Sequence, residues 1–155
     1  MKKPDYEYKS AYEIDYEALK NKGIKGLIFD IDNTLVAHDA PSNEASDKLI
    51  RRLKEMEFEL FILSNNDEER VQKFVKTETV DYIYKAGKPA GRNYEAALNK
   101  MGLTKSEVAA IGDQLLTDCL GAKNYGITFI KVGIIDKKEP FHIKLKRILE
   151  KVLGW

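Results

Sequence analysis

Two carboxylates and a hydroxyl follow a short apolar run near residue 30. The run 27–29 is followed by Asp30, Asp32 and Thr34. An apolar run without polar alternation is typical of a strand that is covered on both faces, as in a parallel sheet. Ligands bind at the carboxyl ends of such strands, because the neighbouring loops diverge there. Two acids at positions i and i+2 can then face one crevice, where one attacks a substrate and the other transfers a proton.

The same spacing also has a purely structural explanation. Asp30 and Asp32 can form an Asx turn, because aspartate side chains often hydrogen-bond to the backbone two residues further on. A short motif of this kind also arises by chance. A functional interpretation therefore requires compatible groups at the ends of other strands.

Three further loops carry such groups, each directly after a predicted strand or strand-like segment. In chain order they are Ser64 with Asn65, Lys88, and Asp113 with Asp118. Useful groups at four successive strand ends are much less expected by chance than any single one of them. Together they suit phosphoryl transfer through an aspartyl intermediate.

Such a reaction needs a metal ion and two acids with different roles. A carboxylate that attacks a phosphate dianion meets charge repulsion, which Mg²⁺ relieves by bridging the two. Mg²⁺ prefers carboxylate and backbone oxygens, so we predict that Asp30, Asp32, Asp113 and Asp118 hold it. Asp32 would contribute its backbone carbonyl, and Asp118 would act through water. Asp30 is the predicted nucleophile and Asp32 the predicted general acid and base.

Phosphate binding is assigned to four residues. A lysine ammonium is a compact positive charge, so Lys88 can meet the phosphate and hold Asp30 ionised. Ser64 and the backbone N–H of Asn65, at a helix N-terminus, can bind the non-bridging oxygens. Thr34, whose hydroxyl follows the two acids, is assigned the same role.

Each member of this set has a structural alternative. Ser64 can cap the helix that follows it, and Lys88 can be an ordinary solvated lysine. Asp113 and Asp118 can belong to a turn and to a helix end. His38 has no partner at metal-ligand spacing, so we expect it to be incidental.

The segments that must position these groups alternate between strands and helices. We predict strands at 27–29, 58–63, 82–84, 108–111 and 127–132, and helices at 15–22, 43–57, 68–76, 93–101 and a segment ending at 126. This alternation favours right-handed crossovers and an α/β fold with a central parallel sheet. One domain over 1–155 is expected, with an N-terminal extension at 1–23, a core at 24–135 and an amphipathic helix at 139–155.

The C-terminal helix allows two interpretations. Its apolar residues lie on one helical face and its basic residues mostly elsewhere; the apolar ones are Phe141, Leu145, Ile148, Leu149 and Val152. The helix can pack this face against the sheet. It can instead lie on an anionic membrane surface, as basic amphipathic helices do.

Composition excludes several other classes of protein. The 26 Lys and Arg residues against 25 Asp and Glu residues leave a net charge of +1, so no nucleic-acid partner is expected. The single cysteine, Cys119, rules out an internal disulfide and a cysteine-cluster zinc site. The first residues have no apolar region of a secretory signal, and no stretch has the length of a membrane span. A cytoplasmic protein is expected, with peripheral contact at the inner membrane face if the helix binds lipid.

These residues resemble the four motifs of the haloacid dehalogenase superfamily of phosphatases. The matching segments are Asp30-Ile31-Asp32-Asn33-Thr34, Ser64-Asn65, Lys88-Pro89, and Gly112-Asp113 with Asp118. The resemblance implies a Rossmann-like three-layer α/β/α sandwich, Mg²⁺ dependence and an aspartyl-phosphate intermediate on Asp30. The segments between the motifs are short, so the chain resembles the capless group, whose open sites tend to accept large or surface-bound substrates.

Within that group, the chain is most similar to the phosphatidylglycerophosphate phosphatase-like branch. The similarity lies in 64–66, in 84–89 and in 111–118. It implies a lipid head group as the substrate, namely the phosphomonoester of phosphatidylglycerophosphate. A soluble sugar phosphate and a phosphoprotein are the alternatives. A more distant alternative is a receiver-like signalling module, which has no need of a general acid and base at Asp32.

Overall fold

A parallel sheet flanked by helices organises the chain, as predicted. The computed structural model describes residues 2–135 and 141–153. Within them, the sheet has the order β1-β6-β5-β2-β3-β4, and every neighbouring pair is parallel. The strands are β1 (Tyr6–Tyr8), β2 (Gly26–Phe29), β3 (Glu59–Leu63), β4 (Asp81–Ile83), β5 (Val108–Gly112) and β6 (Thr128–Val132).

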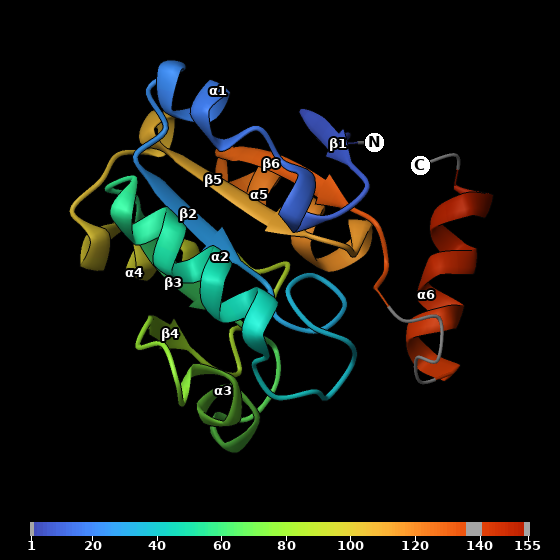
Figure 1. The fold of residues 1–155 in the computed structure, drawn as a ribbon. Helices are drawn as coiled ribbons and strands as arrows, with labels where there is room; N and C mark the ends of the chain where they lie inside the picture. Colours follow the sequence, from blue (N-terminus) through green and yellow to red (C-terminus); the bar gives the residue numbers. More distant parts are fainter. Residues whose placement is uncertain (1, 136–140, 154–155) are drawn as a thin grey trace.

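Helices cover both faces of the sheet (Figure 1). They are α1 (Tyr16–Asn21), α2 (Glu44–Glu55), α3 (Glu68–Val75), α4 (Arg92–Met101), α5 (Leu120–Tyr125) and α6 (Phe141–Val152), with short turns η1 (Ala11–Glu13) and η2 (Lys105–Glu107) and a π-helix, η3 (Leu115–Cys119). Helices α1, α2 and α3 bury side chains against one face, and α4, α5 and η3 against the other. The result is a three-layer α/β/α sandwich without a large inserted domain.

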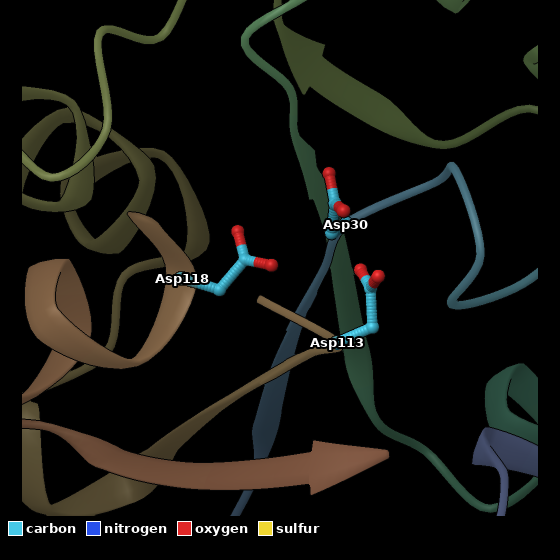
Figure 2. Close-up of side chains that lie close together, drawn as sticks. All are labelled: Asp30, Asp113 and Asp118. Carbon is cyan, nitrogen blue, oxygen red and sulfur yellow. The ribbon is translucent and has the colours of Figure 1, made fainter. Parts of the chain in front are cut away.

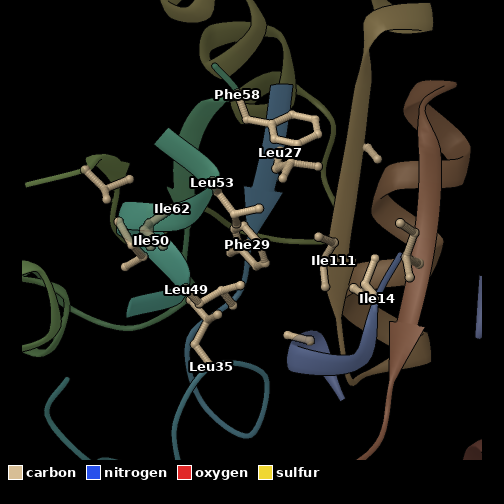
Figure 3. Close-up of a cluster of buried hydrophobic side chains, with 14 of the residues drawn as sticks. Ile14, Leu27, Phe29, Leu35, Leu49, Ile50, Leu53, Phe58, Ile62 and Ile111 are labelled. Atoms are coloured by element: carbon tan, nitrogen blue, oxygen red, sulfur yellow. The ribbon is translucent and has the colours of Figure 1, made fainter. Parts of the chain in front are cut away.

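The alternation of side chains along β2 explains why its sequence is apolar throughout. Leu27 and Phe29 enter the core under α2, whereas Ile28 enters the core on the opposite face. Figure 3 shows the first of these cores, in which Leu49 and Leu53 of α2 meet β2. A strand buried on both sides has no polar positions, as is typical of parallel sheets.

The predicted helix boundaries are set by side-chain caps. At the start of α2, the Asn43 side chain accepts a hydrogen bond from the backbone N–H of Ser46 at 2.9 Å. At the start of α3, the Asp67 side chain accepts one from the backbone N–H of Arg70 at 3.0 Å. Ser64 is therefore not the cap of α3. Gly102 ends α4 in a left-handed conformation, which glycine adopts without steric cost.

The N-terminal extension contains a strand that the sequence prediction missed. Tyr6–Tyr8 pairs with β6 at the edge of the sheet, with Tyr6 aligned to Ile130. Three residues are too few for a clear period-two pattern. Two tyrosines that follow β1 pack against the core: the hydroxyl of Tyr12 donates to Leu35 O and that of Tyr16 to Ala11 O, both at 2.6 Å.

Helix α6 does not pack its apolar face on the sheet, so that interpretation is wrong. Figure 1 shows α6 standing beside the carboxyl edge of the sheet. Leu145, Ile148, Leu149 and Val152 are exposed, with Ile148 at 55% and Val152 at 76% relative accessibility, and the Phe141 side chain lies outside the described part of the structure. The residues predicted at 139–140 and 154–155 lie outside the described part of the chain.

Candidate active site

The register of three central strands brings the predicted groups to one level. Phe29 of β2 is aligned with Ile62 of β3 and with Ile111 of β5. The backbone N–H of Asp30 donates to Ile111 O at 3.0 Å, which fixes the chain at the end of β2. The loops after β2, β3 and β5 therefore leave the sheet side by side. Because the order of connection reverses between β2 and β5, this is also the position where open α/β sheets bind ligands.

Three carboxylates meet at this edge. Asp30, Asp113 and Asp118 each offer an oxygen atom, and these atoms lie within 4.8 Å of one another. Figure 2 shows the three side chains around one space, from the loop after β2, the loop after β5 and η3. Asp113 and Asp118 are buried, so the three carboxylates are held close together in a largely desolvated place.

Asp118 depends on a glycine at the end of β5. A Cβ atom added to Gly112 would lie 2.5 Å from Asp118 Oδ2, closer than real Cβ atoms approach any atom. The same carboxylate oxygen accepts a hydrogen bond from the backbone N–H of Gln114 at 3.2 Å. Gly112 therefore lets η3 bring its acid against the strand.

Lys88 lies between two of the acids. Its Nζ donates to Asp30 Oδ1 at 3.2 Å and to Asp118 Oδ1 at 2.6 Å, and the side chain is buried. Burial alone would lower the pKa of Lys88, but the charges of Asp118 and Asp30 raise it above its ordinary value. Lys88 is therefore a permanent cation, and the alternative of a solvated lysine is wrong.

Burial and mutual repulsion raise the pKa values of two of the acids. Burial raises the pKa of Asp30 well above its usual range, Asp118 raises it further, and Lys88 opposes the shift. Burial and Asp118 also raise the pKa of Asp113 to about 6, against the lowering effect of Arg147. A cluster of acids with raised pKa values in a cleft is characteristic of functional sites.

Asp32 stands apart from the three-carboxylate cluster. Its Oδ1 accepts hydrogen bonds from Arg70 Nη2 at 2.8 Å and from the N–H of Asp39 at 2.6 Å, and its Oδ2 accepts from Asn66 Nδ2 at 2.6 Å. The carboxylate is thus directed by neighbours other than the cluster. Of the predicted metal-binding set, the structure brings together the side chains of Asp30, Asp113 and Asp118, but not that of Asp32.

The predicted phosphate-binding residues separate into two groups. Lys88 and Asn65 line a pocket of about 230 Å³ together with Asp30 and Asp32. The side chain of Asn65 also braces the lysine, because its Oδ1 accepts from Lys88 N at 2.8 Å and its Nδ2 donates to Lys88 O at 3.3 Å. The Asn65 backbone N–H has no hydrogen-bond partner within residues 2–135 and 141–153.

Thr34 and Ser64 are completely buried behind the pocket. The Thr34 hydroxyl donates to Asp113 Oδ1 at 3.2 Å, so in this structure it supports an acid and does not line the pocket where phosphate binding was predicted. Ser64 Oγ accepts from the N–H of Asn66 at 3.1 Å and holds the turn after β3.

Several residues of the site were missed in the sequence. Arg70 of α3 pairs with Asp32, and Arg147 of α6 pairs with the carboxylate of Asp113. Basic residues on amphipathic helices are usually solvent-exposed, so no local signal marked either of them. His38, expected to be incidental, lines the pocket with its Nδ1 4.0 Å from Asp32 Oδ1.

Comparison with known sequences gives a consistent result. The family model for haloacid dehalogenase-like hydrolases matches residues 36–126, which include Lys88 and Asp118 but begin after Asp30. The chain is 38% identical over 151 residues to the probable phosphatase YqeG of Bacillus subtilis, covering 96% of this chain and 87% of that protein.

A second relative is longer than this chain. The chain is 30% identical to phosphatidylglycerophosphate phosphatase 1, chloroplastic/mitochondrial, of Arabidopsis thaliana. The match covers 97% of this chain but only 46% of that protein.

Solved structures share the fold at low sequence identity. The cobalt-bound deoxy-D-mannose-octulosonate 8-phosphate phosphatase of Haemophilus influenzae has a TM-score of 0.56 at 15% identity, over 87% of this chain and 92% of that one. A subfamily III A hydrolase from Legionella pneumophila has a TM-score of 0.52 at 17% identity, over 90% and 92%.

Proposed function

The chain belongs to the haloacid dehalogenase-like hydrolases and is a phosphatase of that superfamily, and on this premise we propose that it hydrolyses a phosphomonoester through a phosphoryl intermediate on Asp30. The observation that carries the proposal is Lys88, which bridges Asp30 and Asp118 at the edge where three carboxylates meet. Because the chain belongs to a family of phosphatases, the alternative of a receiver-like module, whose phosphoryl group serves as a signal, is set aside.

The three carboxylates fit a magnesium ion. They offer hard oxygen ligands whose atoms lie within 4.8 Å of one another, and burial together with the neighbouring carboxylates raises the pKa of Asp30 and of Asp113. We propose that Asp30, Asp113 and Asp118 hold Mg²⁺, with the Asp32 backbone carbonyl as a further ligand. When bound, Mg²⁺ neutralises the charge between the attacking carboxylate and the phosphate.

Asp30 and Asp32 divide the chemistry between them. A carboxylate oxygen of Asp30 attacks phosphorus and the bond to the leaving oxygen breaks, while the Asp32 carboxyl gives that oxygen its proton. Asp32 then takes a proton from a water molecule that attacks the same phosphorus. The acyl-phosphate bond breaks, which releases phosphate and restores the Asp30 carboxylate. Arg70 and Asn66 hold Asp32 in a fixed orientation for both transfers.

Lys88 and Asn65 bind the transferred phosphate. The Lys88 ammonium places a charge beside Asp30, where negative charge accumulates in the transition state. The backbone N–H of Asn65 can donate to a non-bridging phosphate oxygen. Ser64 acts indirectly, because its hydroxyl and backbone hold the turn that presents Asn65.

As substrate we propose phosphatidylglycerophosphate, with the protein in peripheral contact with the cytoplasmic face of a membrane. The Arabidopsis relative supports the lipid assignment by its name. The exposed apolar face of α6 supports the membrane contact, since it stands at the same edge of the sheet as the site and carries Lys151 beside it. Among the helices that the structure describes, none has the length and apolar composition that crossing a bilayer requires.

The test is phosphate release from phosphatidylglycerophosphate in mixed micelles, with Mg²⁺ or with EDTA. Wild type is expected to be active only with Mg²⁺, Asp30→Asn to be inactive, and the exposed control Asp81→Asn to behave like wild type. Hydrolysis of a soluble aryl phosphate without hydrolysis of the lipid would reject the lipid substrate alone. Activity of Asp30→Asn would reject the mechanism.

A further inference from the structure

Helix α6 turns its charged face, not its apolar face, toward the active site. Ile143, Lys146, Arg147 and Glu150 recur at helical spacing and therefore share one side of the helix. Ile143 and Glu150 are buried, and Ile143 and Lys146 line the pocket that contains Asp30. The opposite side of α6 is the exposed apolar face described above. Thus α6 borders the site with the side that carries Lys146.

Two anchors hold this face in position. Arg147 pairs with the Asp113 carboxylate, and its Nη1 also donates to Asp113 O at 3.2 Å. The Glu150 carboxylate accepts hydrogen bonds from the backbone N–H groups of Leu115 at 2.8 Å and Leu116 at 2.9 Å. The first anchor attaches α6 to Asp113, a proposed metal ligand in the loop after β5, and the second attaches it to the first residues of η3. The position of Lys146 relative to the site is therefore fixed by charged contacts on either side of it.

A comparison of the cations around the site singles out Lys146. Lys88 is paired with two acids, Arg70 with Asp32, and Arg147 with Asp113. Lys146 also lines the pocket, but it makes no ion pair with any residue in 2–135 or 141–153. Its charge is consequently available to a ligand in the pocket.

We propose that Lys146 forms a second anion-binding subsite, which recognises a negative group on the leaving-group side of the phosphomonoester. This proposal rests on the proposed function. Since Mg²⁺ and Lys88 meet the charge of the transferred phosphate, Lys146 meets a second charge, such as that of a phosphodiester. The pocket of about 230 Å³ is smaller than the roughly 300–1,000 Å³ of most small-molecule sites, so it holds a head group and leaves any acyl chain outside.

Two soluble ligands test the subsite without a membrane. Glycerophosphoglycerol phosphate carries both a phosphomonoester and a phosphodiester, whereas glycerol phosphate carries the monoester alone. Their dissociation constants are measured by titration calorimetry with Mg²⁺ in an Asp32→Asn background, which keeps the three clustered carboxylates and removes the proposed proton transfers. Adding Lys146→Gln is expected to weaken binding of the first ligand about tenfold or more and to leave the second unchanged.

The control variants separate recognition from folding and from general charge. Lys151→Gln removes an exposed lysine from the same helix, and it should change neither constant. Lys146→Arg should retain most of the affinity because it retains the charge. The proposal would be overturned if Lys146→Gln weakened binding of both ligands equally or of neither. It would also be overturned if the parent protein did not bind the first ligand. Absence of turnover on phosphatidylglycerophosphate in wild type would instead reject the proposed substrate and leave these constants interpretable.

Discussion

At the scale of single residues, the site is a balance between buried acids and buried cations. Asp30, Asp113 and Asp118 converge at a largely desolvated edge of the sheet, and burial disfavours the charged forms of Asp30 and Asp113. Lys88 donates to Asp30 and Asp118, and Arg147 pairs with Asp113. Removal of the Lys88 ammonium would leave the buried carboxylates of Asp30 and Asp118 without the cation that lies between them.

Replacing Lys88 should therefore abolish most of the activity. We expect Lys88→Met to lower kcat on an aryl phosphate by about 10²–10³-fold, because a preorganised donor at the developing charge is lost. The variant Lys100→Met removes an exposed lysine of α4 and should keep wild-type kcat. Steady-state kinetics with saturating Mg²⁺ checks both, and thermal unfolding confirms that each variant is folded. A Lys88→Met enzyme within a factor of about three of wild type would contradict this role.

The positions of the site residues were predictable to different degrees. Asp30, Asp113, Asp118 and Lys88 were found because each follows a strand, and parallel strands end at one edge. Arg70 was not, because its partner Asp32 is distant in the sequence and only the packing of α3 joins them. Long-range pairs of this kind leave no local pattern.

At the scale of elements, α6 shows how much an amphipathic pattern leaves open. The spacing of Leu145, Ile148, Leu149 and Val152 correctly predicted a helix, but not which side faces the protein. The direction is decided by Arg147 and Glu150, which have buried partners in Asp113 after β5 and in the first turn of η3. Because buried ionic partners cannot be read from hydrophobic spacing, the apolar face was assigned to the wrong surroundings.

An exposed apolar face makes a clear prediction for membrane binding. Ile148→Glu adds a negative charge at a side chain that is 55% exposed, so folding should be unaffected. It should weaken binding to vesicles of anionic phospholipid about tenfold or more, since burial of one such side chain contributes roughly 1.5–3 kcal/mol. Cosedimentation with vesicles measures the effect, while hydrolysis of a soluble aryl phosphate should stay the same.

The matched control lies away from α6. Tyr84 follows β4 and is also an exposed large hydrophobic side chain, at 40%. Tyr84→Glu should bind vesicles as wild type does. If Ile148→Glu and Tyr84→Glu bind equally well, α6 is not the membrane-binding element.

At the scale of the whole molecule, the sheet and the two layers of helices were predictable and the edges were not. The central strands β2, β3 and β5 are buried runs with turn signals, and their parallel pairing was expected from the alternation of strands and helices. The edge strand β1 has only three residues, and the π-helix η3 has no sequence pattern distinct from an α-helix. The conformation of both elements is set by tertiary contacts, and their local sequence carries little information about it.

Stability of the whole protein should depend on metal and on pH together. The pKa of Asp113 is raised to about 6 and that of Asp30 is raised as well, so the metal-free native state binds more protons than the unfolded chain. Its stability should therefore fall as the pH rises from about 4, the ordinary carboxylate value, through 6. Mg²⁺ binds the deprotonated acids, so it should stabilise the protein more at pH 7.5 than at pH 5.

Thermal unfolding with Mg²⁺ or EDTA at both pH values measures this linkage. At a Mg²⁺ concentration of about 100 times Kd, the expected gain of about 2.7 kcal/mol corresponds to a rise in Tm of roughly 5–10 °C at pH 7.5. Asp113→Asn should remove most of the rise. The same rise at pH 5 as at pH 7.5 would show that these carboxylates are not the ligands.

The central claim is that Asp30 carries the phosphoryl group, and mass spectrometry of acid-quenched protein tests it most directly. The Asp32→Asn variant is mixed with Mg²⁺ and an aryl phosphate, whose good leaving group needs no proton, so that the intermediate forms but its hydrolysis is slowed. We predict a phosphoryl group on the peptide that contains Asp30. The double variant that carries both Asp30→Asn and Asp32→Asn should show none. A phosphoryl group on another residue, or turnover by Asp30→Asn, would contradict the account.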